Sequence, residues 1–448
     1  MLNENKKCGR ILIVLLLSII FALALQLRIQ YVNKTIVNIP VRADARQYLV
    51  YAYNLFNGTF SKDIPNNSEI LHPDSFRSPG YPLFIVLVYS LGGDTKTVVY
   101  AQAVLSALAV LITFGIGIQF LPLWGAFFAS VLVAISPHLI SMTSYVLTET
   151  LFSFTLLLSI FLFIFAEKKH SKLLFMGSGL LFGYTYLINQ TAIVIPFLFV
   201  FLILFRSSRR KIFLSKTLLF ITIFSLFPVG WVLRNNISLS PDAPKGIDRA
   251  VQTLSHGAYP GFVYKNPDMK YMPYKEDPMQ PAFGGSFYSF SKIFLERFKE
   301  RPFRYVIWYL FEKPYYLWSW NTLQSQVGGN TGRGRGDVYI YSVKTSLYLT
   351  SPGADLSRKF MKLLQPVILV LALAGVFFVY RKYRYGKNNF ELYDWRVFLV
   401  IFYYTIFYTI FAPWPRYSVP LRPELYLFAL WTFNNGIDHI KKKQFKGQ

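Results

Sequence analysis

Long apolar runs restrict the fold of this 448-residue chain more than any other feature. About ten runs of roughly 15 to 22 residues recur along it without amphipathic spacing, and a helix of that length crosses the hydrocarbon core of a bilayer. The predicted spans cover Ile11–Gln26 and residues 97–119, 122–140, 145–166, 172–188, 191–205, 212–232, 360–380, 395–412 and 418–436. We therefore expect an all-α polytopic membrane protein, with residues 1–448 forming one integral-membrane domain.

Positive charge is distributed as in a membrane protein rather than a nucleic-acid-binding protein. The net charge is +25, but Lys and Arg gather in short blocks between the apolar runs, where they contact lipid headgroups and set orientation. With about ten crossings, four blocks fall on the side of the N-terminus: "EKKHSK" (167–172), "RSSRRK" (206–211), "RKYRYGK" (381–387) and "KKKQFK" (441–446). We expect this side to be the inner one and expect no nucleic-acid partner. The single cysteine, Cys8, excludes a disulfide framework within the chain.

Two sizeable segments remain on the outer side, residues 31–96 and 233–358, and polar chemistry is expected there. Each contains an aromatic stretch that we expect to lie along the membrane or to dip into it without crossing. Residues 80–93 are apolar over only about a dozen positions, and residues 301–320 are interrupted by the sequence Glu-Lys-Pro. The outer segments are therefore expected to carry short interfacial helices.

Asp44 is the first candidate for a functional role. It lies between Arg42 and Arg46 in "VRADARQYLV" (41–50). As the N-cap of a short helix, its carboxylate would accept hydrogen bonds from backbone N–H groups while Gln47 reaches back. A chemical role is the alternative, and the residues by themselves leave both open.

Glu149 is the second acidic candidate. It follows Thr148 in "SYVLTETLFSF" (144–154), at the outer start of a predicted span. Thr148 can cap the helix, and a carboxylate there gains from the positive end of the helix dipole. An ionisable group at the membrane edge is also typical of a functional site.

Four arginines lie at the outer ends of apolar segments. They are Arg77 in "HPDSFRSPGYP" (72–82), Arg234 in "PVGWVLRNN" (228–236), and Arg416 and Arg422 in "PWPRYSVPLRPELYLFALW" (413–431). Anchoring to headgroups explains single arginines of this kind. Arg416 and Arg422, however, run against the usual bias of positive charge towards the inner side. An anionic partner on the outer side would offset them, and phosphate is the obvious candidate.

Five segments, in order and over most of the chain, resemble a known family. They are "DARQYLVYAYNLFNGTFS", "FRSPGYPLFIVLVYSLGG", "YVLTETLF", "PVGWVLRN" and "PRYSVPLRPELYLFAL". Together they are similar to the GT-C fold glycosyltransferases that use polyprenyl-phosphate sugars, the family 39-like superfamily of protein O-mannosyltransferases and aminoarabinose transferases. Two departures are the glutamate in "LTET", where many relatives carry aspartate, and the lack of a large soluble domain after the last predicted span.

The resemblance implies a role for each candidate. Asp44 would be the catalytic base that accepts the proton of an acceptor hydroxyl, with Glu149 as the second catalytic acidic residue, and a single in-line displacement would invert the anomeric carbon. The four arginines would bind the donor phosphate. Aromatic side chains would hold the sugar or the first isoprene units: Tyr81, Trp231 and Trp414. No cofactor is indicated with certainty, and a divalent metal near the two carboxylates stays open because no ligand spacing establishes one.

The expected reaction is therefore sugar transfer from a polyprenyl-phosphate donor on the outer, periplasmic face of a bacterial inner membrane. Residues 254–278 have the composition of a lid or acceptor loop. The sugar stays open between a hexose, a pentose and an amino sugar, and the acceptor between lipid A or its core in lipopolysaccharide, another glycolipid, a polysaccharide and a protein. Two other classes also stay open: a transporter or lipid flippase, and a non-enzymatic assembly protein bound to membrane lipids.

Overall fold

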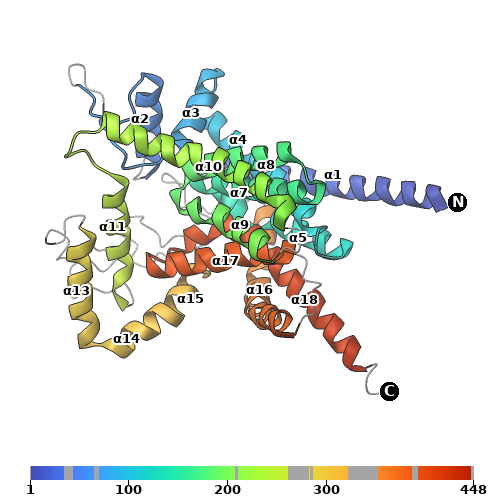
Figure 1. Cartoon of the computed structure of the whole chain (residues 1–448). Helices are drawn as coiled ribbons and strands as arrows, with labels where there is room; N and C mark the ends of the chain where they lie inside the picture. The colour runs from blue at the N-terminus through green and yellow to red at the C-terminus, as the bar shows by residue number, and fades with distance from the viewer. Residues whose placement is uncertain are drawn as a thin grey trace.

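The computed structural model describes residues 2–34, 44–64, 70–206, 210–260, 282, 286–320, 352–385 and 392–444. Throughout these ranges the regular structure is helical and no strand occurs, which confirms the predicted all-α polytopic class (Figure 1). Arg42 and most of the proposed lid at 254–278 lie outside the described residues.

The predicted spans coincide with helices of the bundle. These are α1 (Leu2–Lys34), α4 (Thr95–Gly117), α5 (Leu123–Ile135) with α6 (Pro137–Met142), α7 (Thr148–Lys169), α8 (Lys172–Ile188), α9 (Ile195–Arg206), α10 (Arg210–Ser238), α16 (Pro352–Tyr385), α17 (Leu392–Ile410) and α18 (Arg422–Gln444). Among the described residues, α1, α4, α7, α10 and α16 are long and apolar enough to cross a membrane by length and composition. Shorter apolar helices occur in α5, α8, α9 and α17.

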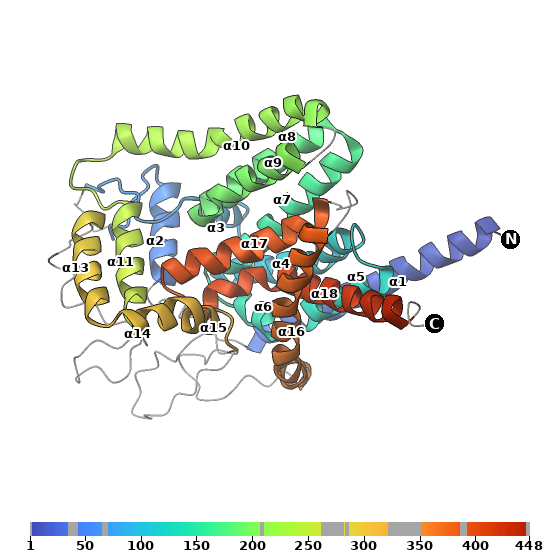
Figure 2. The same cartoon turned by 60° about the horizontal axis from the view of Figure 1, so that its bottom comes forward.

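Shorter elements gather at one end of this bundle, which we name the cavity end. They are α2 (Asp44–Phe56), α3 (Gly80–Ser90), the 3-10 turn η1 (Gln190–Val194), α11 (Gly246–Ala258), α13 (Phe287–Glu300), α14 (Pro302–Ile307), the π-helical turn η3 (Trp308–Glu312), α15 (Lys313–Leu317) and the 3-10 turn η4 (Pro415–Leu421). The start of α1 and the end of α18 lie on the same side of the molecule in both views, opposite α11 and α13 (Figures 1 and 2).

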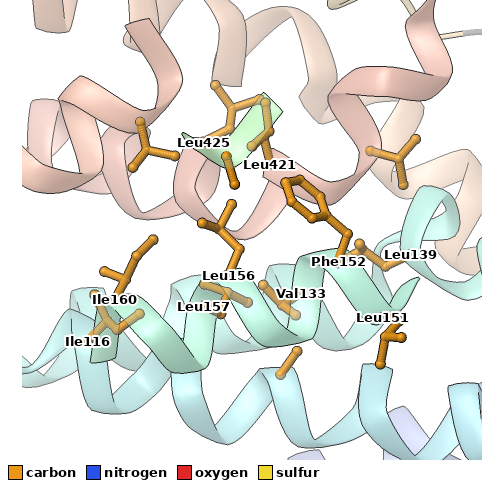
Figure 3. Packing of buried hydrophobic residues seen from close by; sticks show 14 of the residues in the cluster. Ile116, Val133, Leu139, Leu151, Phe152, Leu156, Leu157, Ile160, Leu421 and Leu425 are labelled. Atoms are coloured by element: carbon orange, nitrogen blue, oxygen red, sulfur yellow. The ribbon is translucent and has the colours of Figure 1, made fainter. Parts of the chain in front are cut away.

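The core of the bundle is an apolar cluster shared by α4, α5, α7, η4 and α18 (Figure 3). Small residues let these helices approach closely, as is usual where lipid rather than water surrounds a bundle. A Cβ atom placed on Gly117 of α4 would lie 2.9 Å from the Cβ of Ala126 in α5. Ser153 Oγ of α7 donates to the Pro420 carbonyl of η4 at 2.8 Å, and both elements carry residues of the cavity described below.

A fully buried arginine joins α1 to the break between α5 and α6. Arg28 donates to the carbonyl oxygens of Val133 (3.0 Å) and Ala134 (2.9 Å) and to Ser106 Oγ (2.7 Å). Val133 lies four residues before Pro137, which has no N–H to donate, so from the backbone its carbonyl accepts only a long bond of 3.4 Å from the Ser136 N–H. The predicted first span ended at Gln26, whereas α1 continues to Lys34 because Arg28 is satisfied inside the bundle.

Residues 301–320 form a nearly continuous helical segment rather than a broken one. The π-helical turn η3 ends two residues before Pro314, whose missing N–H disturbs the helical ladder. The charges that suggested an interruption are both paired: Glu312 lies 2.8 Å from Arg304, and Lys313 Nζ donates to the carbonyls of Thr409 (2.8 Å) and Phe411 (2.9 Å). Lys313 thereby caps the C-terminal end of α17.

Residues 80–93 form a helix that is too short to cross the membrane. α3 has 11 residues, and at about 1.5 Å per residue it is about half as long as the hydrocarbon core is thick. Its first residue, Gly80, packs directly on the C-terminal end of α8, since a Cβ atom there would lie 2.5 Å from the backbone nitrogen of Ile188. This contact fixes the loop before α3, which carries Arg77.

Candidate functional site

A cavity of about 370 Å³ opens among α2, α7, α11, α17 and η4 at the cavity end. Of the predicted site residues, it is lined by Asp44, Glu149 and Arg416. The structure therefore brings together three residues that are separated by more than a hundred positions in the chain. Their side chains belong to the polar part of the cavity lining.

Arg77 and Arg416 each bind one oxygen of the Asp44 carboxylate. Arg77 Nη2 lies 2.5 Å from Oδ1, and Arg416 Nη2 lies 3.0 Å from Oδ2. Arg77 is fixed from behind, because it also donates to Gln47 Oε1 (2.8 Å from Nε) and stacks over the Tyr48 ring at 5.0 Å. Asp44 itself keeps 30% of its side chain exposed. Its carboxylate is thus oriented by guanidinium groups and still faces the cavity.

Glu149 completes the cluster from the first turn of α7. Its Oε1 lies 2.9 Å from Arg416 Nε, so that one guanidinium group bridges the two acidic residues. The sequence suggested that Thr148 could cap α7, but Thr148 is the first residue of the helix. The N-cap position is Leu147, and no side chain caps the helix. Gln47 also does more than the expected local capping, because its Oε1 accepts a hydrogen bond from Arg77 Nε.

Neighbouring positive charge determines the protonation state of Asp44. Burial favours the neutral acid, but the charges of Arg77, Arg416 and Arg249 outweigh it and hold the pKa of Asp44 well below its usual range. The carboxylate is therefore ionised at neutral pH. It can accept a proton or a hydrogen bond, although the same charges make it a weaker base.

Arg249 is a cavity residue that the sequence analysis missed. It projects from α11, is half-buried, lines the cavity, and forms no ion pair within the described parts of the chain. In the sequence, Arg249 is simply one arginine of the large outer segment. It lies on an amphipathic helix, and charged residues of such a helix are ordinarily expected to face solvent. With Arg77 and Arg416 it places three guanidinium groups around two carboxylates.

Close packing holds α11 over the cavity. A Cβ atom on Gly257 would lie 2.2 Å from the carbonyl oxygen of Phe411, so the helix backbone rests directly on the chain that follows α17. Trp308 Nε1 donates to the Gly257 carbonyl at 3.0 Å. Val251 and Leu254 of α11 pack with Phe290 of α13 in a separate apolar cluster. α13 to α15 thus support the helix that carries Arg249.

Aromatic side chains form the apolar part of the cavity. Phe407 of α17 stacks on Phe411, just after that helix, at 4.5 Å between ring centroids, and Tyr408 stacks on Tyr417 of η4 at 4.8 Å. All four line the cavity. The sequence analysis predicted that Tyr81, Trp231 and Trp414 would hold the sugar or the lipid, but none of these three residues lines the cavity.

The three predicted aromatic residues lie behind or beside the cavity. Tyr81 is fully buried, packs edge-on against Tyr48 at 5.1 Å and donates to Gln102 Oε1 at 2.7 Å. Trp231 packs against Phe60, and Trp414 is buried next to η4. Their positions indicate support of the surrounding helices rather than direct contact with a ligand in the cavity.

Two of the predicted arginines also face away from the cavity. Arg422 is fully buried and donates to Gln365 Oε1 at 2.9 Å and to the Ser319 carbonyl at 3.2 Å. Arg234 donates to the carbonyls of Asp74 (2.7 Å) and Phe60 (3.2 Å). Both arginines join segments that are distant in sequence, which explains their places at helix ends without a bound anion.

Asp74 organises the loop that presents Arg77, and its role was not anticipated. Its carboxylate accepts hydrogen bonds from the Tyr51 hydroxyl, from the backbone N–H of Lys62 (2.6 Å) and from that of Phe76 (2.9 Å). Together with the contact from Arg234, these bonds fix the chain just before Arg77. In the described part of the chain, no group of three or more His, Cys, Asp or Glu residues lies close enough to hold a metal ion.

Comparison with known proteins gives a family match over part of the chain. Residues 72–232 match the sequence model of a family described as dolichyl-phosphate-mannose-protein mannosyltransferase. This region contains Arg77 and Glu149, and it ends two residues before Arg234. No curated protein sequence matches the chain.

Comparison with solved structures identifies the fold. The apo oligosaccharyltransferase of Archaeoglobus fulgidus aligns with a TM-score of 0.51 at 12% identity, covering 97% of this chain and 52% of that one. AglB of the same organism, in complex with an inhibitory peptide and a dolichol-phosphate, gives 0.48 at 12% identity, covering 98% and 52%. ArnT of Cupriavidus metallidurans bound to undecaprenyl phosphate gives 0.41 at 13% identity, covering 92% and 76%. The chain spans about half the length of the archaeal structures and has the GT-C fold of an integral membrane protein.

Proposed function

We propose that this chain, whose residues 72–232 match a mannosyltransferase family, is an inverting glycosyltransferase that moves a sugar from a polyprenyl-phosphate donor to an acceptor hydroxyl. The observation that carries the proposal is the cluster of three guanidinium groups and two carboxylates at an aromatic-lined cavity. Such a cluster offers a base and an anion site within one enclosed space, as transfer from a lipid phosphate requires.

The family description supports the class of donor, because it names a lipid phosphate that carries a sugar. The position of the cavity supports a membrane-embedded donor, because the cavity lies at one end of the apolar bundle. The basic blocks predict that this end faces outward. We accordingly place the reaction at the outer face of the membrane, which is the periplasmic face if the source is a bacterium with an inner membrane.

Each step of the transfer has a residue suited to it. The acceptor hydroxyl gives its proton to the Asp44 carboxylate while its oxygen forms a bond to the anomeric carbon. The bond from that carbon to the phosphate oxygen breaks, and its electron pair goes to the leaving phosphate. Arg249 and Arg416 stabilise the charge that develops there. One displacement from the side opposite the leaving group inverts the anomeric carbon.

The remaining site residues have supporting roles in this proposal. Glu149 orients Arg416, and Arg77 orients Asp44. The stacked rings of Phe407, Tyr408 and Tyr417 offer apolar faces to the sugar or the first isoprene units. Hexoses, pentoses and amino sugars all fit this chemistry, and the acceptor can be a glycolipid, a polysaccharide or a protein.

The proposal is tested by separating the base from the phosphate site. Asp44→Asn keeps the size of the side chain but cannot accept the proton, so turnover should fall on the order of 100-fold or more while undecaprenyl phosphate still binds. Arg249→Ala removes a proposed phosphate ligand that forms no ion pair with any residue the structure describes, so binding and transfer should weaken together. Arg249→Lys should recover only part of the loss, because a point charge cannot replace a bidentate fork.

Binding of undecaprenyl phosphate in nanodiscs and sugar transfer from a polyprenyl-phosphate donor are the two measurements. Lys245→Ala is the matched control: it removes an exposed positive charge just before α11 that does not line the cavity, and both quantities should stay unchanged. Normal turnover by Asp44→Asn would remove the assignment of the base. Unchanged binding by Arg249→Ala would remove the phosphate site, and saturable uptake of a soluble substrate would favour a transporter.

A further inference from the structure

Arg416 is shared between the two carboxylates of the cavity. Its Nη2 lies 3.0 Å from Asp44 Oδ2, and its Nε lies 2.9 Å from Glu149 Oε1. Hydrogen bonds between a guanidinium and a carboxylate are among the stronger polar contacts in proteins. A phosphate that enters the cavity must therefore compete with two of the protein's own anions for this guanidinium.

The other guanidinium on Asp44 is not available for such competition. Arg77 is 4% exposed, donates to Gln47 through both Nε (2.8 Å) and Nη2 (2.5 Å), and lies over the Tyr48 ring. Arg416 is 19% exposed and lines the cavity directly. Of the two arginines on Asp44, Arg416 is the one that an incoming ligand can reach.

We propose that Arg416 exchanges partners during the reaction, pairing with Asp44 and Glu149 in the absence of a lipid phosphate and turning to the phosphate when one is bound. The inference rests on the proposed function and adds to it a change of partner for Arg416 between the donor-free and the donor-bound protein. Arg249 would meet the incoming anion first, since its guanidinium has no ion pair among the described residues. Arg416 would follow by giving up one or both carboxylates.

This exchange would couple the strength of the base to the presence of the donor. Removing one guanidinium from a carboxylate raises its affinity for a proton. Asp44 would therefore become a stronger base only when the donor occupies the cavity. As the sugar leaves, the phosphate changes from a diester to a more highly charged monoester, so Arg416 would bind the departing group more strongly than the donor, as catalysis requires.

The test is a double-mutant cycle on the binding of undecaprenyl phosphate to the full-length protein in nanodiscs, measured by native mass spectrometry. Glu149→Gln removes one competitor for Arg416, so Kd should fall by about three- to tenfold. In the Arg416→Met background the same substitution should change Kd by less than about twofold, because the shared guanidinium is gone.

Simple charge attraction predicts a different pattern. Loss of a negative charge near the cavity favours any anion, but that contribution persists without Arg416. Equal tightening by Glu149→Gln in both backgrounds would therefore overturn the exchange. Asp94→Asn is the matched control, because Asp94 is an exposed N-cap of α4 outside the cavity and Asn caps a helix equally well. It should leave Kd unchanged in both backgrounds.

Two further outcomes separate this inference from the proposed function. Wild-type protein that fails to bind undecaprenyl phosphate would contradict the proposed function itself, whereas binding without coupling would contradict only the exchange. If Arg416→Met does not fold, Arg416→Lys replaces it in the cycle. The lysine cannot bridge both carboxylates, so the effect of Glu149→Gln should again shrink, and a full-sized effect would count against the exchange.

Discussion

Asp44 holds its negative charge between two guanidinium groups, and this determines how activity should depend on pH. Its pKa lies well below the ordinary value near 4, and the ionised form is the one that accepts a proton. In the donor-free protein, protonation of Asp44 therefore should not reduce kcat/KM between about pH 5 and 8. Arg416→Met removes one of the charges that lower this pKa, so any loss of kcat/KM in acid should begin at a higher pH in that variant.

The measurement is kcat/KM for the donor against pH for both proteins, because kcat/KM reports the donor-free protein, in which Arg416 pairs with Asp44. If activity falls in acid above about pH 5 at the same pH in both proteins, the group that is protonated is not Asp44. If activity of the wild type falls above about pH 5 and this fall moves to a higher pH in Arg416→Met, the group is Asp44 and its pKa is not low.

At the scale of single residues, the sequence identifies cavity side chains when they break a local rule. Asp44, Glu149 and Arg416 stand out because ionisable groups are unusual at the ends of apolar segments. The same rule also selects Arg422, whose partners are Gln365 and a backbone carbonyl that sequence spacing does not reveal. Arg249 breaks no local rule, since a charged residue on an amphipathic helix is ordinary, and only tertiary packing turns it towards the cavity.

At the scale of elements, the position of α11 depends on a backbone contact that only glycine permits. A Cβ atom on Gly257 would lie 2.2 Å from the Phe411 carbonyl oxygen and 2.7 Å from Ala412 Cα, and neither backbone atom can rotate away. Gly257→Ala should therefore shift α11 and Arg249 with it. We expect a loss of about 1–3 kcal/mol of stability and weaker binding of undecaprenyl phosphate.

Thermal unfolding and the binding measurement check this expectation. Gly230→Ala in α10 is the control, because no atom lies within 4 Å of the added Cβ atom. Alanine is the better helix former, so this variant should be neutral or slightly more stable. Wild-type behaviour of Gly257→Ala in both measurements would mean that α11 is not fixed by this contact.

The ends of helices were harder to predict than their existence, and the reason differs from case to case. Apolar length alone indicates a span, because lipid leaves a backbone few alternatives to a helix. Where an element ends depends on partners from elsewhere in the chain. Arg28 allows α1 to continue past Gln26 by donating to α5 carbonyls, and Lys313 allows a charged stretch to remain helical by capping α17.

At the scale of the whole molecule, the arrangement of the two termini agrees with the parity of about ten crossings. The start of α1 and the end of α18 lie at the same end of the bundle, opposite α11 and α13 (Figures 1 and 2). Four basic blocks were assigned to the side of the N-terminus on sequence grounds. The blocks around Lys172 and Arg381 belong to described helices, so the side on which each lies can be tested directly.

Labelling of single cysteines from outside, in a Cys8→Ser background, distinguishes the two sides. Tyr288 of α13 is 81% exposed at the cavity end, and Lys172 is exposed at the start of α8. A membrane-impermeant maleimide should modify Tyr288→Cys in intact cells and should modify Lys172→Cys only after the membrane is opened.

If α14 and α15 crossed the bilayer as a true span, α13 and the end of α17 would be separated by the membrane. Lys313, however, binds the carbonyls at the end of α17, which keeps this segment on the cavity side. Labelling of both positions from outside, or of Lys172→Cys alone, would therefore contradict both the count of crossings and the placement of the cavity on the outer face.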